Sequence, residues 1–212
     1  MRVSAVATVL FAVAQLGSSR FDAKFLFANP QSCEADTPSG RRVTTLCTGL
    51  RYSFVSDAGQ RLTETQARQS GVSVELRIAS NVDGFLTVWE ISTDGGRQLT
   101  PFDPDDYISG GGRWTGLLRS AGIEYTVTGR MRFEGGENAK RLILVFSRSQ
   151  TEQPIDAQHA LRILERQATW RDRFGPVLIR FEDSSVEPIG TYVVSRIGMP
   201  VATEILLLQR GP

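Results

Sequence analysis

Three aspartates close together in one segment are the residues whose types most directly suggest chemistry. Asp103, Asp105 and Asp106 stand in the stretch PFDPDDYISGGG, residues 101–112. Carboxylate oxygens are hard ligands that suit Ca²⁺. The stretch lacks the glycine and the distal glutamate of an EF-hand loop, and aspartates in such segments also form turns and cap helices. We therefore keep the three aspartates as candidate binding residues and predict no metal ion.

Two aromatic residues flank the glycine run that ends this stretch. Tyr107 and Trp114 could form a platform for a sugar or for a protein partner, although both could instead pack within the loop or the core. The run Gly110–Gly112 could wrap an anion with its backbone amides. It lacks the Lys-Ser/Thr pair of a phosphate-binding loop, so a flexible loop is the better interpretation.

Catalytic groups do not form a recognisable pattern in the sequence. His159 is the only histidine and lies among polar residues near the start of an expected helix. No serine occupies a Gly-x-Ser-x-Gly elbow, and neither cysteine has the local signature of a nucleophile. Paired carboxylates, such as Glu182 and Asp183, are expected in turns with solvated side chains. A carboxylate pair for glycoside hydrolysis is an open alternative, because only the spatial separation of the two groups decides it.

The first fourteen residues resemble a segment for export. One basic residue, Arg2, precedes the uncharged run VSAVATVLFAVA, and Ala12-Val13-Ala14 is an A-x-A cleavage pattern. A run of about 12 apolar residues is shorter than the ~20 that a membrane-spanning helix needs. We predict a signal peptide over residues 1–14, cleavage after Ala14, no membrane span afterwards, and a periplasmic or extracellular location.

The two cysteines of the chain follow this segment. In an oxidising compartment Cys33 and Cys47 can form a disulfide, which would close a loop of about 15 residues and stabilise the fold by about 3 kcal/mol. Two buried free thiols are the alternative. With a single histidine in the chain, a zinc site built on these cysteines is not expected.

Composition places limits on size and partners. The 212 residues suit one domain with some additions, and a 41% hydrophobic content suffices for a core. The 24 basic and 23 acidic residues give a formal charge of +1, so no large single-sign field is available to attract nucleic acid. We expect an N-terminal arm over 15–48 and a single β-rich domain over 49–212.

The segment Gly71–Ile91 is the strongest indication of fold. Residues 72–78 alternate between apolar and polar types, which is typical of a half-buried strand. Asn81-Val82-Asp83-Gly84 has turn chemistry, and residues 85–91 are rich in aromatic and β-branched types. We interpret the segment as a hairpin of two paired strands. Phe85, Thr87, Trp89 and Ile91 share one face of the second strand, and Leu86, Val88 and Glu90 share the other.

Further segments extend this pattern to about eight strands. Strands are predicted at 50–55, 97–100, 113–118, 123–133, 141–148, 191–195 and 203–209, whereas 62–70 is expected to be a loop. The run of five apolar residues in 141–148 suggests a strand covered on both faces. One helix is expected near 156–173, capped by Asp156, with Ala160, Leu161, Leu164 and Ala168 on one face. The fold class is therefore mainly β, an antiparallel β-sandwich or barrel.

In this order the motifs resemble a bacterial domain family of unknown function, number 4384. The resemblance begins at Gly49-Leu50-Arg51-Tyr52, is centred on Asn81–Val88, continues through Leu99–Gly111 and 142–148, and ends with 191–194 and 204–207. It covers roughly residues 49–210 and is carried by structural rather than catalytic motifs. The resemblance implies a β-rich, usually extracytoplasmic module without an established activity.

The expected function is that of an exported, non-catalytic interaction module of the bacterial envelope. Its partner would be a protein or a glycan, and its contact surface would be the loop from Leu99 to Trp114, because loops on a rigid sheet commonly carry binding. No cofactor is predicted. The alternative is a secreted hydrolase that acts on an envelope or extracellular polymer through paired carboxylates.

Overall fold

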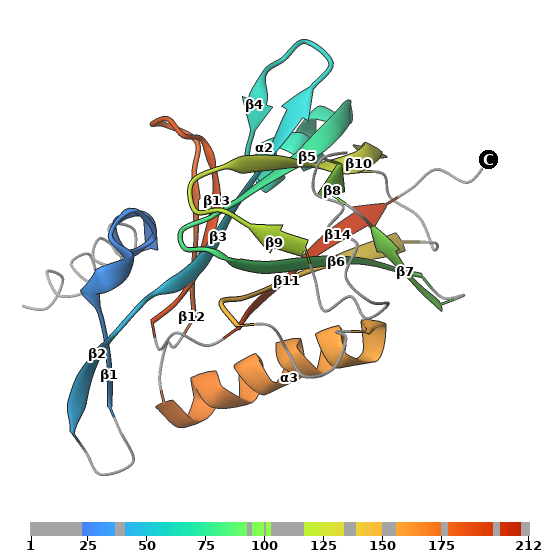
Figure 1. Ribbon diagram of the computed structural model, residues 1–212. Helices are drawn as coiled ribbons and strands as arrows, with labels where there is room; N and C mark the ends of the chain where they lie inside the picture. Colours follow the sequence, from blue (N-terminus) through green and yellow to red (C-terminus); the bar gives the residue numbers. More distant parts are fainter. Residues whose placement is uncertain are drawn as a thin grey trace, which may run out of the picture.

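The protein folds as two antiparallel β-sheets in a sandwich-like arrangement that does not close into a barrel (Figure 1). The computed structural model describes residues 23–36, 41–92, 95–99, 101–102, 117–133, 139–149, 156–174, 178–196 and 200–208. The mainly β, antiparallel fold expected from the sequence is confirmed, and of its two forms the sandwich is the one adopted.

The larger sheet has the strand order β12-β13-β3-β5-β10-β8, with β4 added alongside β3. Its strands are β3 (Thr48–Ser56), β4 (Arg61–Leu62), β5 (Ser73–Ser80), β8 (Pro101–Phe102), β10 (Glu124–Arg132), β12 (Leu178–Asp183) and β13 (Gly190–Ser195). The strands predicted at 50–55, 123–133 and 191–195 correspond to β3, β10 and β13. Strand β12 was not predicted.

The smaller sheet has the order β14-β11-β6-β7, and β9 pairs with β6. Its strands are β6 (Gly84–Ser92), β7 (Gly95–Leu99), β9 (Leu117–Arg119), β11 (Ala139–Ser147) and β14 (Val201–Leu208). The described residues form more strands than the eight expected. Strands β1, β2, β4 and β8 are too short to produce a clear alternating pattern, whereas β9 overlaps the strand predicted at 113–118.

The main core lies between the two sheets and is built from alternate residues of each strand. Leu50, Tyr52 and Phe54 of β3 are buried in one cluster with Leu142, Leu144 and Phe146 of β11. Complete burial of a large apolar side chain stabilises a fold by about 1.5–3 kcal/mol. The side chains between these positions must then point outward, which places Arg51 and Ser53 on the outer face of the larger sheet.

The predicted hairpin over Gly71–Ile91 is wrong, because its two strands belong to different sheets. Strand β5 pairs with β3 and β10, whereas β6 pairs with β11, β7 and β9. The Asn81 side chain fixes the crossing: its Oδ1 accepts from the Gly49 N–H at 2.7 Å, and its Nδ2 donates to the Cys47 carbonyl at 3.1 Å. Alternation predicts a strand and its buried face but does not identify the neighbouring strand.

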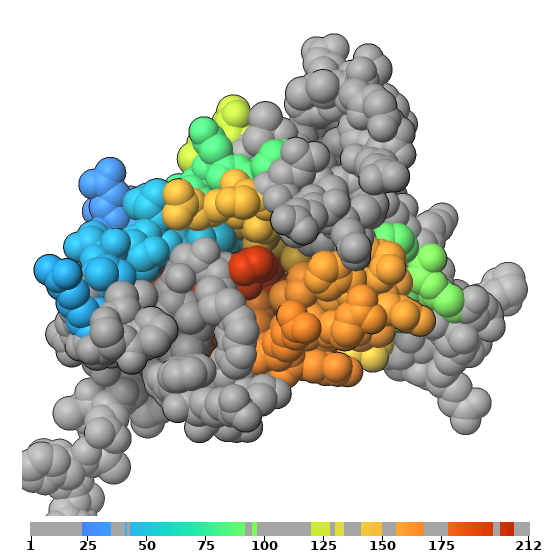
Figure 2. Space-filling view, turned by 60° about the horizontal axis from the view of Figure 1, so that its bottom comes forward, coloured from blue at the N-terminus to red at the C-terminus, as the bar shows by residue number. Residues whose placement is uncertain are grey.

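Helix α3 (Ala157–Phe174) packs on the outer face of the smaller sheet (Figure 1), and its first part, in orange, lies at the molecular surface in Figure 2. Asp156 caps it as predicted, since its Oδ1 accepts from the His159 N–H at 2.6 Å. Ala160, Leu161 and Leu164 pack with residues of β11 such as Ile143. Strand β11 is therefore covered on both faces, as expected, and the side chain of Ala168 lies outside the described residues.

The loop predicted over residues 62–70 is wrong, because Glu64–Ser70 form helix α2. Thr63 and Gln66 make a capping box, in which each side chain accepts from the backbone N–H of the other residue. Gly71 ends the helix with a φ of 60°, in the left-handed region that favours glycine. The Thr-x-x-Gln spacing was the sequence signal for this helix.

The N-terminal arm packs against the outer face of the larger sheet. Residues 23–28 are helical, η1 (Pro30–Ser32) follows, and β1 (Cys33–Asp36) pairs with β2 (Arg42–Thr45). The predicted disulfide is confirmed: Cys33 and Cys47 are bonded, with a Cα–Cα distance of 5.2 Å. Leu26 and the two cysteines form a small second core with Val194 of β13. The predicted signal segment, residues 1–14, lies outside the described residues.

No helix in the described part of the chain has both the length and the apolar character that a membrane crossing requires.

Candidate functional site: an arginine cluster on the larger sheet

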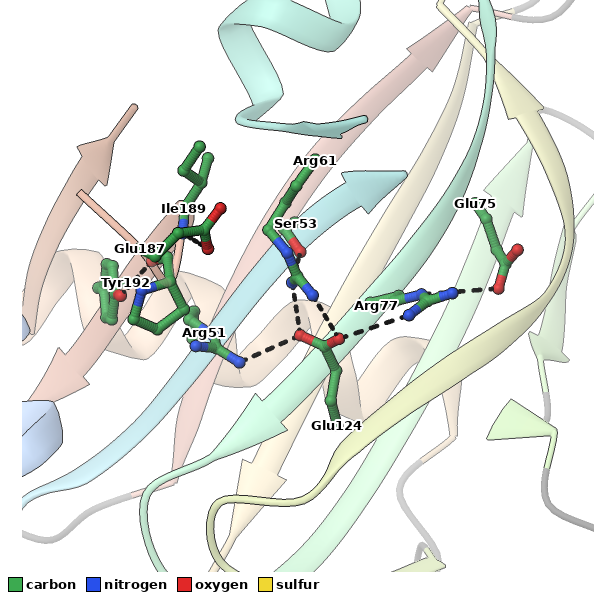
Figure 3. A network of polar contacts seen from close by, with 10 residues as sticks. Arg51, Ser53, Arg61, Glu75, Arg77, Glu124, Glu187, Ile189 and Tyr192 are labelled. Carbon is green, nitrogen blue, oxygen red and sulfur yellow. Dashed lines mark hydrogen bonds and ion pairs between the residues drawn. The ribbon is translucent and has the colours of Figure 1, made fainter. Parts of the chain in front are cut away.

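Three arginines converge on one carboxylate on the outer face of the larger sheet (Figure 3). Arg51 comes from β3, Arg61 from β4 and Arg77 from β5, and they surround Glu124 at the start of β10. We call these four residues the arginine cluster. Their neighbours along the strands, such as Tyr52 and Leu62, point into the core, so strand alternation directs the charged side chains outward.

Arg61 holds Glu124 with a two-pronged contact. Its Nη1 and Nη2 donate to Oε1 and Oε2 of Glu124 at 2.6 and 2.8 Å, and Nη1 also donates to the Ser53 hydroxyl at 2.7 Å. Such a fork matches the planar geometry of a carboxylate. Both side chains are largely buried, with exposed fractions of 23% for Arg61 and 19% for Glu124. Arg61 is therefore the group that positions Glu124.

The two remaining arginines contact Glu124 less closely. Arg51 donates from Nη2 to Oε1 at 3.1 Å, whereas Nη1 of Arg77 is 3.7 Å from Oε2. Arg77 also lies 3.8 Å, through Nε, from Oε1 of Glu75 on its own strand. The Nε atoms of Arg51 and Arg77 are buried and have no hydrogen-bond partner among the described residues. Part of the donor capacity of the cluster is therefore unused.

The electrostatics of the cluster keep Glu124 ionised. Partial burial alone would raise the pKa of the Glu124 carboxyl, but the Arg61 hydrogen bonds and the charges of all three arginines outweigh burial and hold that pKa below its usual range. The same hydrogen bond with Glu124 raises the pKa of Arg61. A carboxylate held ionised in this way is a poor general acid, so the cluster is better suited to charge recognition than to proton transfer.

The arginine-rich face extends along β10. Arg130 is paired in register with Glu75, and Arg132 with Ser73, so both side chains lie on the same face as Arg77. Arg130 is 55% exposed and forms an ion pair with Asp57. The basic side chains described on this part of the face are all arginines, the residue type that binds carboxylates bidentately.

A second polar network joins helix α2 to the larger sheet and is centred on the buried Glu64. Glu64 is 6% exposed, and its Oε2 accepts from the Tyr52 hydroxyl and from Nη2 of Arg180, each at 2.6 Å. Its Oε1 accepts from Nε and Nη2 of Arg68 at 3.0 and 2.5 Å. Burial and the adjacent Glu64 charge raise the pKa of Tyr52, which therefore stays a neutral donor. This network attaches α2 to β3 and β12.

We expected Glu182 and Asp183 to lie in a turn with solvated side chains, and the structure places both differently. Glu182 and Asp183 end strand β12 rather than lying in a turn, and Asp183 is buried. Its Oδ2 accepts from Lys24 at 2.7 Å, and its Oδ1 accepts from the N–H groups of Ser185 and Val186. Asp183 is therefore an anchor for the N-terminal arm rather than a solvated acid.

The binding residues named from the sequence are Asp103, Asp105, Asp106, Tyr107 and Trp114, and all five lie outside the described residues. Of the candidate site residues, the structure places only the disulfide cysteines Cys33 and Cys47. Within the described ranges, no three acidic, histidine or cysteine side chains are grouped so that they could hold a metal ion.

Sequence reasoning missed the arginine cluster. Each member is an ordinary polar position in an alternating strand, so the sequence signal was only that Arg51, Arg77 and Glu124 point away from the core. Their convergence depends on the strand order β3-β5-β10, which links residues 73 positions apart.

Comparisons of the chain with protein-family models, with curated proteins and with solved structures find no match.

Proposed function

We propose that the protein is an exported, non-catalytic binding module of the bacterial envelope, with a periplasmic or extracellular location. Its contact surface is the outer face of the larger sheet around the arginine cluster, and its partner is an anionic protein or glycan. The observation that carries the proposal is the presence of three guanidinium groups, fixed on neighbouring strands, around a single carboxylate.

A rigid support makes this arrangement suitable for binding. The cluster residues lie on strands whose opposite face is the main core, so their backbone positions are fixed before a ligand arrives. A site that is already ordered avoids part of the entropic cost of association. The excess of guanidinium over carboxylate then favours a partner of negative charge.

Two features support the proposal that the protein is exported. The apolar N-terminal segment with its A-x-A pattern is typical of a signal peptide. The Cys33–Cys47 disulfide is compatible with an oxidising compartment. The resemblance to domain family 4384, which implies an extracytoplasmic β-rich module, is part of the same proposal.

Co-sedimentation with the envelope fraction of the producing bacterium tests the proposal. The protein, purified with its disulfide formed, is compared with the double variant Arg77→Gln/Arg130→Gln. The matched control is Arg162→Gln/Arg166→Gln, which also removes two positive charges, from exposed positions on α3. We expect this control to sediment like the wild type and the Arg77→Gln/Arg130→Gln variant to lose binding. Equal sedimentation of all three proteins would refute the surface assignment.

The loop from Leu99 to Trp114 remains a separate prediction for the contact surface. Replacement of Tyr107 and Trp114 by alanine tests it in the same assay. Loss of binding in this variant, with full binding by Arg77→Gln/Arg130→Gln, would move the contact surface from the sheet to the loop.

A further inference from the structure

Arg77 is the arginine of the cluster with the weakest internal contacts. Its distances to Glu124 and Glu75, 3.7 and 3.8 Å, exceed the length of a hydrogen bond. Its Nε donates to no described residue. Its side chain is 36% exposed, compared with 12% for Arg51 and 23% for Arg61. Arg77 therefore combines a buried stem with a guanidinium that can reach a ligand.

The surroundings of Arg77 limit the charge of that ligand. Glu75 and Glu124 lie on either side of the guanidinium, as Figure 3 shows, and both repel an incoming anion. Arg130, paired in register with Glu75, is the next guanidinium on this face and is 55% exposed. A singly charged carboxylate meets less repulsion from the two glutamates than a doubly charged phosphate does. A carboxylate also matches the fork of an arginine side chain.

The polar composition of the face favours a sugar polymer over a protein surface. The carboxylate of Glu75 is partly exposed beside Arg77, so an acceptor for sugar hydroxyls stands next to a donor for an acid group. The large apolar side chains that the structure describes as exposed are Phe25, Val43, Val72, Ile123 and Val186, none of them a member of the cluster. Protein interfaces usually centre on apolar or aromatic anchors.

We infer that Arg77 binds a carboxylate of an acidic polysaccharide, with Arg61 as the positioning residue and with Glu75 and Glu124 as internal competitors for the same guanidinium. The inference rests on the proposed function and specifies the ligand class of that surface. Removal of a competing carboxylate should therefore strengthen ligand binding, whereas in a purely structural ion-pair network it would have no such effect. Glu75 is the better position to change, because its only ion pair among the described residues is the long contact with Arg77.

Calorimetric titration with polygalacturonate as the probe tests the inference. We expect the wild type to bind polygalacturonate and not its neutral methyl ester. Arg77→Gln should weaken binding by about tenfold or more, because charge-assisted contacts are lost. Arg77→Lys should restore little of the lost affinity, since an ammonium group cannot form a two-pronged contact with a carboxylate. Glu75→Gln should tighten binding by about threefold, because a like charge is removed. Arg162→Gln on α3 should bind like the wild type.

Other results would overturn the inference. Equal affinity for dextran sulfate would show recognition of any polyanion, and tighter binding of poly-L-glutamate would indicate an acidic protein partner. Full binding by Arg77→Lys would refute the two-pronged contact between the guanidinium and the ligand carboxylate. Weaker binding by Glu75→Gln would refute the competition between Glu75 and the ligand. A thermal melt of each variant excludes misfolding as the cause.

The experiments distinguish failure of the proposed ligand class from failure of the proposed function. Absence of polygalacturonate binding, together with envelope sedimentation that depends on Arg77 and Arg130, would overturn the ligand class and leave the binding module in place. Absence of both would overturn the proposed function as well.

Discussion

Lys24 and Asp183 are 159 residues apart in the sequence and form an ion pair with an Nζ–Oδ2 distance of 2.7 Å. Lys24 belongs to the helical segment 23–28, and Asp183 is the last residue of β12. Lys24 also donates to the Val186 carbonyl and lies over the Tyr192 ring. This contact attaches the N-terminal arm to the larger sheet, and the Cys33–Cys47 disulfide joins the start of β1 to the residue that precedes β3.

Asp183→Asn should make the stability of the protein less dependent on acid pH. Burial opposes ionisation of Asp183, but the Lys24 ammonium and the bonds from Ser185 and Val186 outweigh it and hold the pKa of Asp183 well below its usual range. The ionised group therefore stabilises the fold above the ordinary aspartate pKa of about 4, and this contribution is lost as the pH falls towards the folded-state value.

Urea denaturation at neutral pH and near pH 2.5 measures the effect. We expect the variant to lose about 1–3 kcal/mol at neutral pH and much less in acid. A stability difference that is the same at both pH values would contradict the ionic role of Asp183.

Replacement of both cysteines, Cys33→Ser with Cys47→Ser, should lower the free energy of unfolding by about 3 kcal/mol, the chain-entropy value for a loop of this length. The separation of the two cysteines is 14 residues. The Lys24–Asp183 contact should still hold the arm in part. Thermal melts give the stability, and limited proteolysis followed by mass spectrometry locates the new cleavage. Cleavage in the sandwich before the arm would contradict the separate attachment of the arm.

The local sequence pattern was sufficient to predict most of the long strands, β12 excepted, but not which strands pair with one another. Alternation in 50–55 and 72–78 correctly indicated β3 and β5 and their buried faces, and the disulfide was predicted because the two cysteines follow an expected export segment. Pairing depends on where the chain goes after each strand, and turn-forming residues at 81–84 suit a hairpin as well as a crossing between sheets. The arginine cluster could not be predicted for the same reason, since Arg51 and Glu124 meet only through the strand order.

Asn81→Ala should destabilise the crossing between the sheets. The Asn81 side chain satisfies the Gly49 N–H and the Cys47 carbonyl in a buried position. Each buried backbone group left without a partner costs roughly 1–3 kcal/mol, so a loss of about 2–4 kcal/mol is expected. Guanidinium denaturation measures it. Asn81→Asp keeps the acceptor for Gly49 but sets a carboxylate oxygen against the Cys47 carbonyl in a buried position, so it should also be destabilising. Equal stability of the wild type and the alanine variant would refute this role.

Gly84→Ala should be destabilising for a steric reason. A Cβ at this position would lie 2.5 Å from the carbonyl oxygen of Ser147 and 2.7 Å from Cζ of Phe146. Gly84 does not have the positive φ expected of a hairpin turn. It permits a close approach of β6 to β11, so the added methyl group forces a backbone shift that costs about 1–3 kcal/mol. An unchanged melting temperature would contradict the close approach.

Arg61→Gln and Arg77→Gln should separate the positioning residue from the contact residue by their effects on stability. Arg61 holds both carboxylate oxygens of Glu124 and the Ser53 hydroxyl, so its loss should cost about 1.5–3 kcal/mol. Among the described residues Arg77 makes only long ion pairs, and its loss should cost less than about 1 kcal/mol. Because the folded-state pKa of Glu124 is lowered, its pairing with Arg61 stabilises the fold above the ordinary glutamate pKa of about 4.3, and this contribution fades as the pH falls. Urea denaturation of both variants at neutral and acid pH measures these differences; a larger loss for Arg77→Gln than for Arg61→Gln would assign the positioning role to Arg77 instead.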